Sequence, residues 1–288
     1  MPRIVLGNRG GVLALPQARG VLAELSEGWP DVNIIQKTVQ GGSQDGASEL
    51  LEALSAGRVN IALQSLEGLP PTLPEGLVLT SVTKRLEPRA ALVNRAGEDL
   101  ASLAAGSVVG VSTPRDRAFL LASRKDVEVK TVAGDVDANL SLLATGEVDA
   151  LVMASAHLLQ LERRERINTL LEPATFTPAV GQGSLGLVVK EDDDLAIDLA
   201  YTLQHRPSFD RVRAERSFAR VLSRATSHAL GALASVTSEG DLNLFGAVAD
   251  MQGDLVIQAE ISGEAGEAED LGRELAQDVL DQLKQHTF

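Results

Sequence analysis

Ala214-Glu-Arg-Ser-Phe-Ala-Arg-Val-Leu-Ser-Arg-Ala-Thr-Ser-His-Ala-Leu-Gly231 is the stretch on which the interpretation of the whole chain depends. Its first half places Phe218, Val221 and Leu222 on one side of a helix, because side chains three and four positions apart share a helix face. Small residues follow, and they predict a loop that leads into a strand. The stretch therefore predicts the start of a C-terminal α+β domain covering residues 210–288.

The amino-acid composition limits the class of protein. A chain of 288 residues is longer than one typical domain, so two or three domains are expected. The absence of cysteine excludes disulfides, cysteine-bound zinc and thiol nucleophiles. The four histidines are scattered without the spacing of metal ligands, so no metal site is predicted.

Charge and hydropathy bear on partners and location. The formal net charge of −14 disfavours nucleic acid and anionic membrane surfaces as partners. No apolar run is long enough for a transmembrane helix, and the start of the chain has no signal-peptide pattern. We therefore expect a cytoplasmic protein without a membrane partner.

The first part of the chain alternates strands and helices. The hydrophobic pattern predicts strands at 3–7, 32–39 and 59–63, and helices at 13–25 and 46–56. Pro16 is expected in the first turn of its helix. This β-α-β-α-β order implies parallel strands with right-handed crossovers. The turn at 8–11 is expected to present backbone N–H groups to an anion.

A second set of strands and helices follows from about residue 91 to 175. Strands are predicted in it at 107–111, 127–132 and 150–153, and helices at 115–123 and 137–144. A strand at 77–82 is predicted before this set, and a strand at 185–189 and a helix at 194–205 are predicted after it. The last part contains predicted strands at 242–248 and 255–261, then an amphipathic helix at 267–285. Pro88, between two strands, suits a hinge.

Motifs along the chain resemble those of the porphobilinogen deaminases (hydroxymethylbilane synthases). Arg9-Gly-Gly-Val-Leu-Ala-Leu15 is similar to the family's Arg-x-Ser-Pro-Leu-Ala-Leu. Pro178-Ala-Val-Gly-Gln-Gly-Ser-Leu-Gly-Leu187 is nearly identical to Pro-Ala-Val-Gly-Gln-Gly-Ala-Leu-Gly-Ile. The stretch from Ala214 is similar to Ala-Glu-Arg-x-Phe followed by Gly-Gly-Cys-x-x-Pro-Ile-Gly. Further matches lie at 57–70, 85–93, 109–121, 132–140 and 156–161, so the resemblance covers essentially the whole chain.

The resemblance implies an α/β fold with two periplasmic-binding-protein-like (type II) β-α domains that face a cleft, plus a third, smaller α+β domain. Domain 1 would comprise 1–86 and 176–205, domain 2 would comprise 90–175, and domain 3 would comprise 210–288. Members of the family condense four porphobilinogen molecules into hydroxymethylbilane. A cysteine in the third domain carries their covalent dipyrromethane cofactor.

This chain departs from the family at the positions that carry the chemistry. The family's aspartate falls on Gly68, its lysine on Glu67, its histidine on Gln64 and its cofactor cysteine on Thr226. Arg9 and Arg115 keep two of the family's arginines. The other arginine positions hold Asp116, Ala133, Asn139 and Gln160. With no thiol to hold it, no dipyrromethane or other cofactor is predicted.

We therefore expect a catalytically degenerate homologue, a pseudoenzyme, that binds a small anionic molecule or a protein of the tetrapyrrole pathway. The predicted ligand-binding residues are Arg9, Gly10, Gly11, Ser65, Ser112, Thr113 and Arg115.

Two alternatives stay open. One is an active synthase whose primer is non-covalent or linked to Thr226, with His228 as the adjacent base and Asp116 or Asp135 in place of the aspartate. The other is a two-lobed solute-binding module unrelated to tetrapyrroles.

Three further patterns favour structural roles over catalytic ones. The acidic residues at 135–137 and 192–194 suit helix starts. The glycines of Gly181-Gln-Gly-Ser-Leu-Gly186 suit a close-packed crossover, because a strand follows them where a nucleotide-binding motif needs a helix. Ser184 does not have the spacing of a nucleophile elbow.

Overall fold

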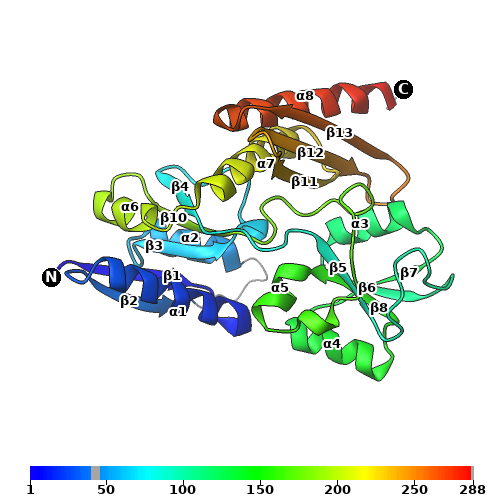
Figure 1. The fold of residues 1–288 in the computed structure, drawn as a ribbon, viewed down its shortest axis with the longest axis horizontal. Coiled ribbons are helices and arrows are strands. Elements are labelled where there is room, and N and C mark those ends of the chain that lie inside the picture. The colour runs from blue at the N-terminus through cyan, green and yellow to red at the C-terminus, as the bar shows by residue number, and fades with distance from the viewer. Residues whose placement is uncertain (40–45, 287–288) are drawn as a thin grey trace. The chain divides into compact units, whose positions relative to one another are not determined.

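A computed structural model describes residues 1–39 and 46–286 (Figure 1). The chain divides into two compact units. Unit 1 comprises Met1–Arg85 and Ser184–Phe209, and unit 2 comprises Leu86–Gly183 and the chain from Asp210 onward. Within the described residues, no helix has the length and apolar character needed to cross a membrane.

Unit 1 is built on a five-stranded sheet in the order β2-β1-β3-β10-β4. Its strands are β1 (Arg3–Asn8), β2 (Asn33–Thr38), β3 (Ile61–Ser65), β4 (Leu77–Val82) and β10 (Leu185–Lys190). β1 pairs in parallel with β2 and β3, as the alternating order predicts. β10 inserts antiparallel between β3 and β4, so the returning chain completes the sheet.

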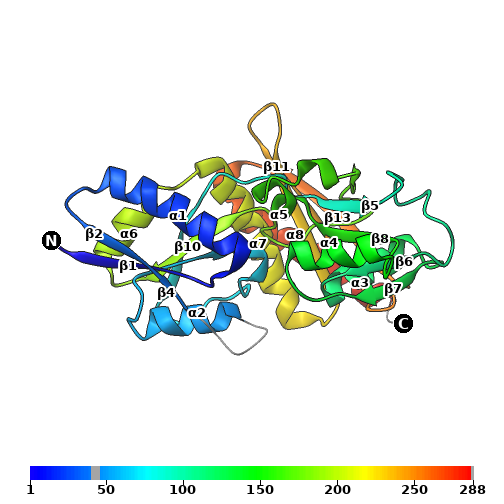
Figure 2. The ribbon, with the colours of Figure 1, turned by 90° about the horizontal axis from the view of Figure 1, so that it is seen from below.

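Helices cover both faces of this sheet (Figure 2). They are α1 (Gly11–Gly28), α2 (Gly46–Ser55) and α6 (Asp194–Tyr201), with the short 3-10 helix η1 (Leu66–Gly68) directly after β3. α1 and α6 pack on one face through a core that includes Leu25 and Leu199, both fully buried. α2 contributes Leu50 to the other face, where it lies against Gly7 of β1.

Two predicted helix boundaries in unit 1 were wrong. α1 begins at Gly11 instead of residue 13, so Pro16 lies inside the helix and not in its first turn, and it cannot donate to the Val12 carbonyl. α6 ends at Tyr201 instead of residue 205. The chain leaves that helix because the next segment bonds to β4: the His205 N–H donates to the Val82 carbonyl at 2.9 Å.

The first sheet of unit 2 has the order β7-β6-β8-β5-β9. Its strands are β5 (Ala90–Asn94), β6 (Val108–Val111), β7 (Glu128–Thr131), β8 (Ala150–Ala154) and β9 (Thr169–Leu170). β6 pairs in parallel with β7 and β8, and β5 is antiparallel to β8 and β9. This repeats the arrangement of unit 1, with β6 in the place of β1 and β5 in the place of β10. The expectation of two β-α domains of the periplasmic-binding-protein type is confirmed.

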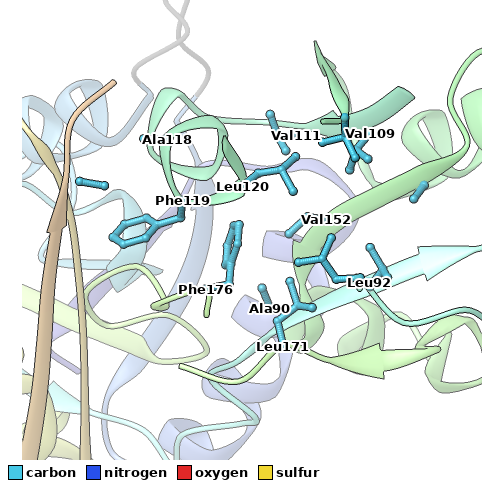
Figure 3. Packing of buried hydrophobic residues seen from close by; sticks show 14 of the residues in the cluster. Ala90, Leu92, Val109, Val111, Ala118, Phe119, Leu120, Val152, Leu171 and Phe176 are labelled. Atoms are coloured by element: carbon cyan, nitrogen blue, oxygen red, sulfur yellow. The ribbon is translucent and has the colours of Figure 1, made fainter. Parts of the chain in front are cut away.

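The helices of this part of unit 2 are α3 (Pro114–Ser123), α4 (Val136–Thr145), α5 (Ser155–Gln160) and the 3-10 helix η2 (Arg164–Arg166). Its core is aliphatic around one aromatic pair, Phe119 and Phe176, whose ring centroids lie 6.1 Å apart (Figure 3). The predicted strands and helices between 107 and 153 are present.

The third sheet is antiparallel, in the order β11-β12-β13. Its elements are β11 (Ala229–Val236), β12 (Leu242–Ala249) and β13 (Val256–Gly263), with α7 (Arg206–Ala225), η3 (Ala265–Glu267) and α8 (Ala268–His286). Phe218 of α7 and Leu275 of α8 pack on Gly246, where a Cβ would lie 2.6 Å from the Phe218 ring. The predicted smaller α+β part is therefore present.

The second and third sheets share a core. Ala247 and Ala249 of β12 belong to the same buried cluster as Phe119 and Phe176. This shared apolar surface explains why both sheets fall into one compact unit. The three domain ranges predicted from the sequence stay a prediction, and the last two residues of the third lie outside the described part of the chain.

Candidate functional site

The turn after β1 is shaped by Asn8. Its side-chain oxygen accepts a hydrogen bond from the Gly10 N–H at 2.8 Å. Gly10 and Gly11 have φ values of 73° and 87°, a conformation that favours glycine. Because Asn8 already occupies the Gly10 N–H, an anion at this turn would bond to the N–H groups at the start of α1 instead.

The structure brings two of the family's positions together within unit 1. Gly68 ends η1, which follows β3, and Arg9 follows β1, so both lie where parallel strands end. A Cβ on Gly68 would lie 4.0 Å from the Arg9 Nη1 atom. Within residues 1–39 and 46–286, the exposed Arg9 side chain makes no hydrogen bond or ion pair. The arginine therefore stands beside the position that lacks the family's carboxylate.

Unit 1 also contains two buried polar side chains, Gln64 and Ser184, that sequence reasoning did not link. Gln64 of β3 pairs with Gly186 of β10, so Ser184, two positions before Gly186, lies on the same sheet face as Gln64. Gln64 and Ser184 are 6% and 2% exposed. In the described structure, neither atom of the Gln64 amide nor the Ser184 hydroxyl has a hydrogen-bond partner. Buried groups of this kind call for a water or a ligand atom.

Ser65 and Glu67 complete the segment between β3 and Gly68. Ser65 is the last residue of β3 and is half-buried, with no side-chain hydrogen bond to the start of η1. Glu67 occupies the family's lysine position and is also half-buried. The family's lysine position therefore holds a glutamate in this chain, and the family's aspartate position holds a glycine.

Arg115 has a different environment. Its Nη1 donates to the Thr177 carbonyl, and its Nη2 lies 2.5 Å from the Asp116 carboxylate. The guanidinium also lies 5.4 Å and 5.5 Å from the ring centroids of Phe119 and Phe176. Asp116, at the family's second arginine position, is therefore the counter-charge that we expected an external anion to supply.

The neighbouring hydroxyls are also partly committed. Thr113 caps α3, because its hydroxyl accepts from the Asp116 N–H at 3.0 Å. Ser112 is exposed. Arg9 and Arg115 belong to different units, so the prediction of a single anion between them stays a prediction.

The other replaced arginine positions lie on or beside the helices of unit 2. Ala133 is exposed just before α4, and Gln160 ends α5. Asn139 of α4 is 4% exposed, and its side-chain oxygen has no hydrogen-bond partner among the described residues. None of the three can supply a positive charge.

The acidic pairs serve as helix starts, as predicted. Asp135 caps α4 by accepting from the Ala138 N–H at 2.9 Å. Asp193 caps α6 by accepting from the Ala196 N–H at 3.1 Å. No group of three or more histidine, aspartate or glutamate side chains within the described residues is arranged to hold a metal ion.

Thr226 lies in the loop between α7 and β11. Its hydroxyl accepts from the His228 N–H at 3.1 Å and is also in hydrogen-bond contact with the His228 Nδ1 atom. Because the Thr226 oxygen accepts one bond, its proton is free to point at the ring. The contact brings a hydroxyl and a base together, as a nucleophile would require. A threonine hydroxyl that bonds to the backbone N–H two residues later is also common in turns that have no catalytic role.

The Ala214-Glu215-Arg216 motif has a structural role. The buried Glu215 carboxylate accepts from the Gly181 N–H at 2.7 Å and the Ala234 N–H at 2.8 Å. It therefore ties α7 to the crossover segment and to β11. Burial, and then the adjacent Arg220 guanidinium, lower the pKa of Arg216 to about 10.

Comparison with known proteins supports the resemblance over the whole chain. Residues 4–198 match the family model described as porphobilinogen deaminase, dipyromethane cofactor binding domain. Residues 209–281 match the porphobilinogen deaminase C-terminal domain.

Individual relatives are similar over nearly their full length. The chain is 43% identical to a porphobilinogen deaminase of Thermus thermophilus, over 97% of this chain and 96% of that protein. It is 38% identical to one of Deinococcus radiodurans, over 98% and 96%. A TRAP periplasmic solute binding protein from Desulfovibrio salexigens shows a TM-score of 0.48 at 13% identity, over 70% of this chain and 72% of that one.

Proposed function

The chain belongs to the porphobilinogen deaminase family, which acts in the tetrapyrrole pathway, and we propose that it is a catalytically degenerate member that binds a small anion at Arg9. The observation that carries the proposal is the pairing of Arg9 with Gly68. A Cβ at position 68 would lie 4.0 Å from the Arg9 Nη1 atom, so an aspartate there would stand beside the guanidinium, and this chain has a glycine.

The missing carboxylate bears on catalysis. In the family, the aspartate stabilises positive charge on the pyrrole nitrogens as the carbon–carbon bond forms. Stabilising a developing charge with a positioned group contributes roughly 3–4 kcal/mol, a factor of about 10² to 10³ in rate. No cysteine is present to anchor the cofactor either. Both losses oppose synthesis of hydroxymethylbilane.

The charge pattern bears on the ligand. A tetrapyrrole precursor carries many carboxylates, but four of the family's arginine positions hold Asp116, Ala133, Asn139 and Gln160. Each charge-assisted hydrogen bond contributes about 1.5–3 kcal/mol, so the loss of several disfavours a polyanion. The Arg9 guanidinium, which has no partner among the described residues, lies near the start of the 18-residue helix α1 and suits an anion with one or two charges.

The proposal is tested by activity, mass and binding together. We expect no consumption of porphobilinogen and a denatured mass equal to that of the bare polypeptide. Calorimetry should show inorganic phosphate binding that Arg9→Ala weakens at least about tenfold. Arg19→Ala is the matched control, since Arg19 is an exposed arginine on α1. Turnover of porphobilinogen, or phosphate binding indifferent to Arg9→Ala, would contradict the proposal.

A second candidate is an active synthase with its primer on Thr226, and the contact between the Thr226 hydroxyl and His228 Nδ1 favours it. It requires a mass increase of one dipyrromethane that survives denaturation and disappears in Thr226→Val. If the primary proposal holds instead, even Thr226→Cys should form no hydroxymethylbilane, because Gly68 supplies no carboxylate.

A further inference from the structure

Unit 1 contains a pocket of about 490 Å³ that is separate from the Arg9 site. One wall is α1, from Pro16 to Glu24. The second wall consists of the residues that follow β4 and α6, together with Leu185 at the start of β10. Neither Arg9 nor Gly68 lines it, so its ligand would not compete with an anion beside Arg9.

The second wall is held in place by hydrogen bonds within unit 1. The Val82 N–H donates to the Gln204 side-chain oxygen at 2.8 Å. The Thr83 N–H donates to the Leu185 carbonyl at 3.0 Å, and the Arg85 N–H donates to the Ser208 hydroxyl at 2.9 Å. The pocket therefore has a fixed framework, which lowers the ordering cost of binding.

The same bonds fix the state of the His205 ring, which also lines the pocket. Because the Ser208 hydroxyl oxygen accepts from Arg85, its proton is available for the His205 Nδ1 atom at 2.8 Å. The Ser208 N–H also donates to Nδ1, at 3.3 Å. Nδ1 is thus an acceptor, and in the neutral ring Nε2 carries the proton and can donate to a ligand.

Two opposite charges line the pocket, and neither has a partner in the described part of the chain. Glu24 lies on α1 and Lys84 follows β4, and both side chains are exposed. Neither makes an ion pair or a hydrogen bond with the described part of the chain. The lining also includes the apolar side chains of Val21, Leu185 and Leu203 among polar ones. A ligand with a negative group, a positive group and a short apolar body would complement all three features.

We propose that this pocket binds an apolar α-amino acid. Its carboxylate would pair with Lys84 and accept from the His205 Nε2–H, and its ammonium would pair with Glu24. Its side chain would cover Val21 and Leu203. A simple anion satisfies Lys84 and leaves Glu24 facing a like charge, whereas a simple cation does the reverse, so only the zwitterion is attracted by both walls.

Binding would also affect the segments that leave unit 1. Lys84 comes just before the boundary after Arg85, and Leu203 and His205 come just before the boundary after Phe209. A ligand that touches both walls ties these segments to α1. It should therefore slow hydrogen exchange of the amides at 82–85 and 203–208.

The test is calorimetry on the full chain with L-leucine as the probe. Isovalerate and isopentylamine, which keep the same side chain but only one of the two charges, are the comparison ligands. We expect saturable binding of leucine and at least about tenfold weaker binding of either half-molecule. Lys84→Gln and Glu24→Gln should each weaken leucine binding about tenfold or more.

Matched controls separate the pocket from general surface charge. Glu27→Gln and Arg19→Gln change exposed charges on α1 that do not line the pocket, and they should leave the affinity unchanged. Absence of leucine binding would overturn the proposal. So would isovalerate binding within about threefold of leucine, or leucine binding indifferent to both pocket substitutions.

Discussion

Arg9 and Arg115 follow equivalent strands of two sheets that share one topology. β1 and β6 are each the second strand of their sheet, next to the edge strand β2 or β7, and α1 or α3 follows them in the chain. Arg9 ends in solvent with no partner in the described structure, whereas Arg115 is bonded to Asp116 and Thr177 and stacked on two rings.

The difference shows that an arginine at equivalent positions of two similar sheets can serve stability in one case and ligand binding in the other. The neighbour decides the outcome: Asp116 neutralises Arg115, while Gly68 offers Arg9 nothing. A guanidinium that is already paired contributes to stability and little to binding. An unpaired one contributes to binding and little to stability.

The largest expected effect is on stability. Arg115→Ala should lower the free energy of unfolding by about 2–4 kcal/mol, because it leaves the Asp116 carboxylate and the Thr177 carbonyl without a partner and uncovers two rings. Arg9→Ala should change it by less than about 0.5 kcal/mol. Urea unfolding followed by far-UV circular dichroism measures both, since the single tryptophan, Trp29, lies in unit 1 and does not report on unit 2.

Equal changes in the free energy of unfolding for Arg115→Ala and Arg9→Ala would contradict the difference between the two arginines. If Arg115→Ala unfolded like the unsubstituted protein, the guanidinium would not be held in unit 2. If Arg9→Ala were strongly destabilising, Arg9 would have a structural partner. Arg117→Ala, which removes an exposed arginine from α3, controls for the loss of positive charge alone.

The sequence predicted the order of strands and helices well, because each element buries one face and that burial leaves a period in the chain. It did not predict the fate of Arg115. Thr177 and Phe176 lie some sixty residues away in the chain, and only the packed core brings them to α3. The end of α6 was missed for the same reason, since His205 bonds to Val82.

The candidate site was predicted in part. The motif match singled out positions 9 and 68, and a Cβ on Gly68 would lie 4.0 Å from the Arg9 Nη1 atom. The buried amide of Gln64 and the hydroxyl of Ser184 were not linked, because strand register between β3 and β10 decides which face they share. The contact between Thr226 and His228 agrees with the sequence-based pairing of a hydroxyl with an adjacent base, and it lies in the loop between α7 and β11.

A smaller effect is expected when the counter-charge of Arg115 is removed. Asp116→Asn keeps the shape of the side chain and removes its charge, so the Arg115 guanidinium becomes available to an external anion. We expect phosphate affinity in calorimetry to rise by a factor of about three to ten, or a second, weaker site to appear. Asp126→Asn removes a carboxylate that pairs with Arg124 elsewhere in unit 2, and it should have no such effect. An unchanged isotherm for Asp116→Asn would mean that Arg115 is closed to anions even when unpaired.

The smallest expected effect concerns Arg9, when it is given a carboxylate neighbour. Gly68→Asp would give Arg9 the kind of neighbour that Arg115 has, and the added Cβ fits, since among the described residues nothing else lies within 4 Å of it. Exposed ion pairs contribute about 0.2–1 kcal/mol, so phosphate affinity should fall by a factor of about 1.5 to 5 while stability rises by no more than that energy. Gly68→Asn has nearly the same shape without the charge and should leave phosphate binding unchanged. If both substitutions reduced binding equally, the effect would be steric, and Arg9 would not be the group that attracts the anion. Gly68→Asp should still form no hydroxymethylbilane, because a carboxylate beside Arg9 does not replace the missing thiol at position 226.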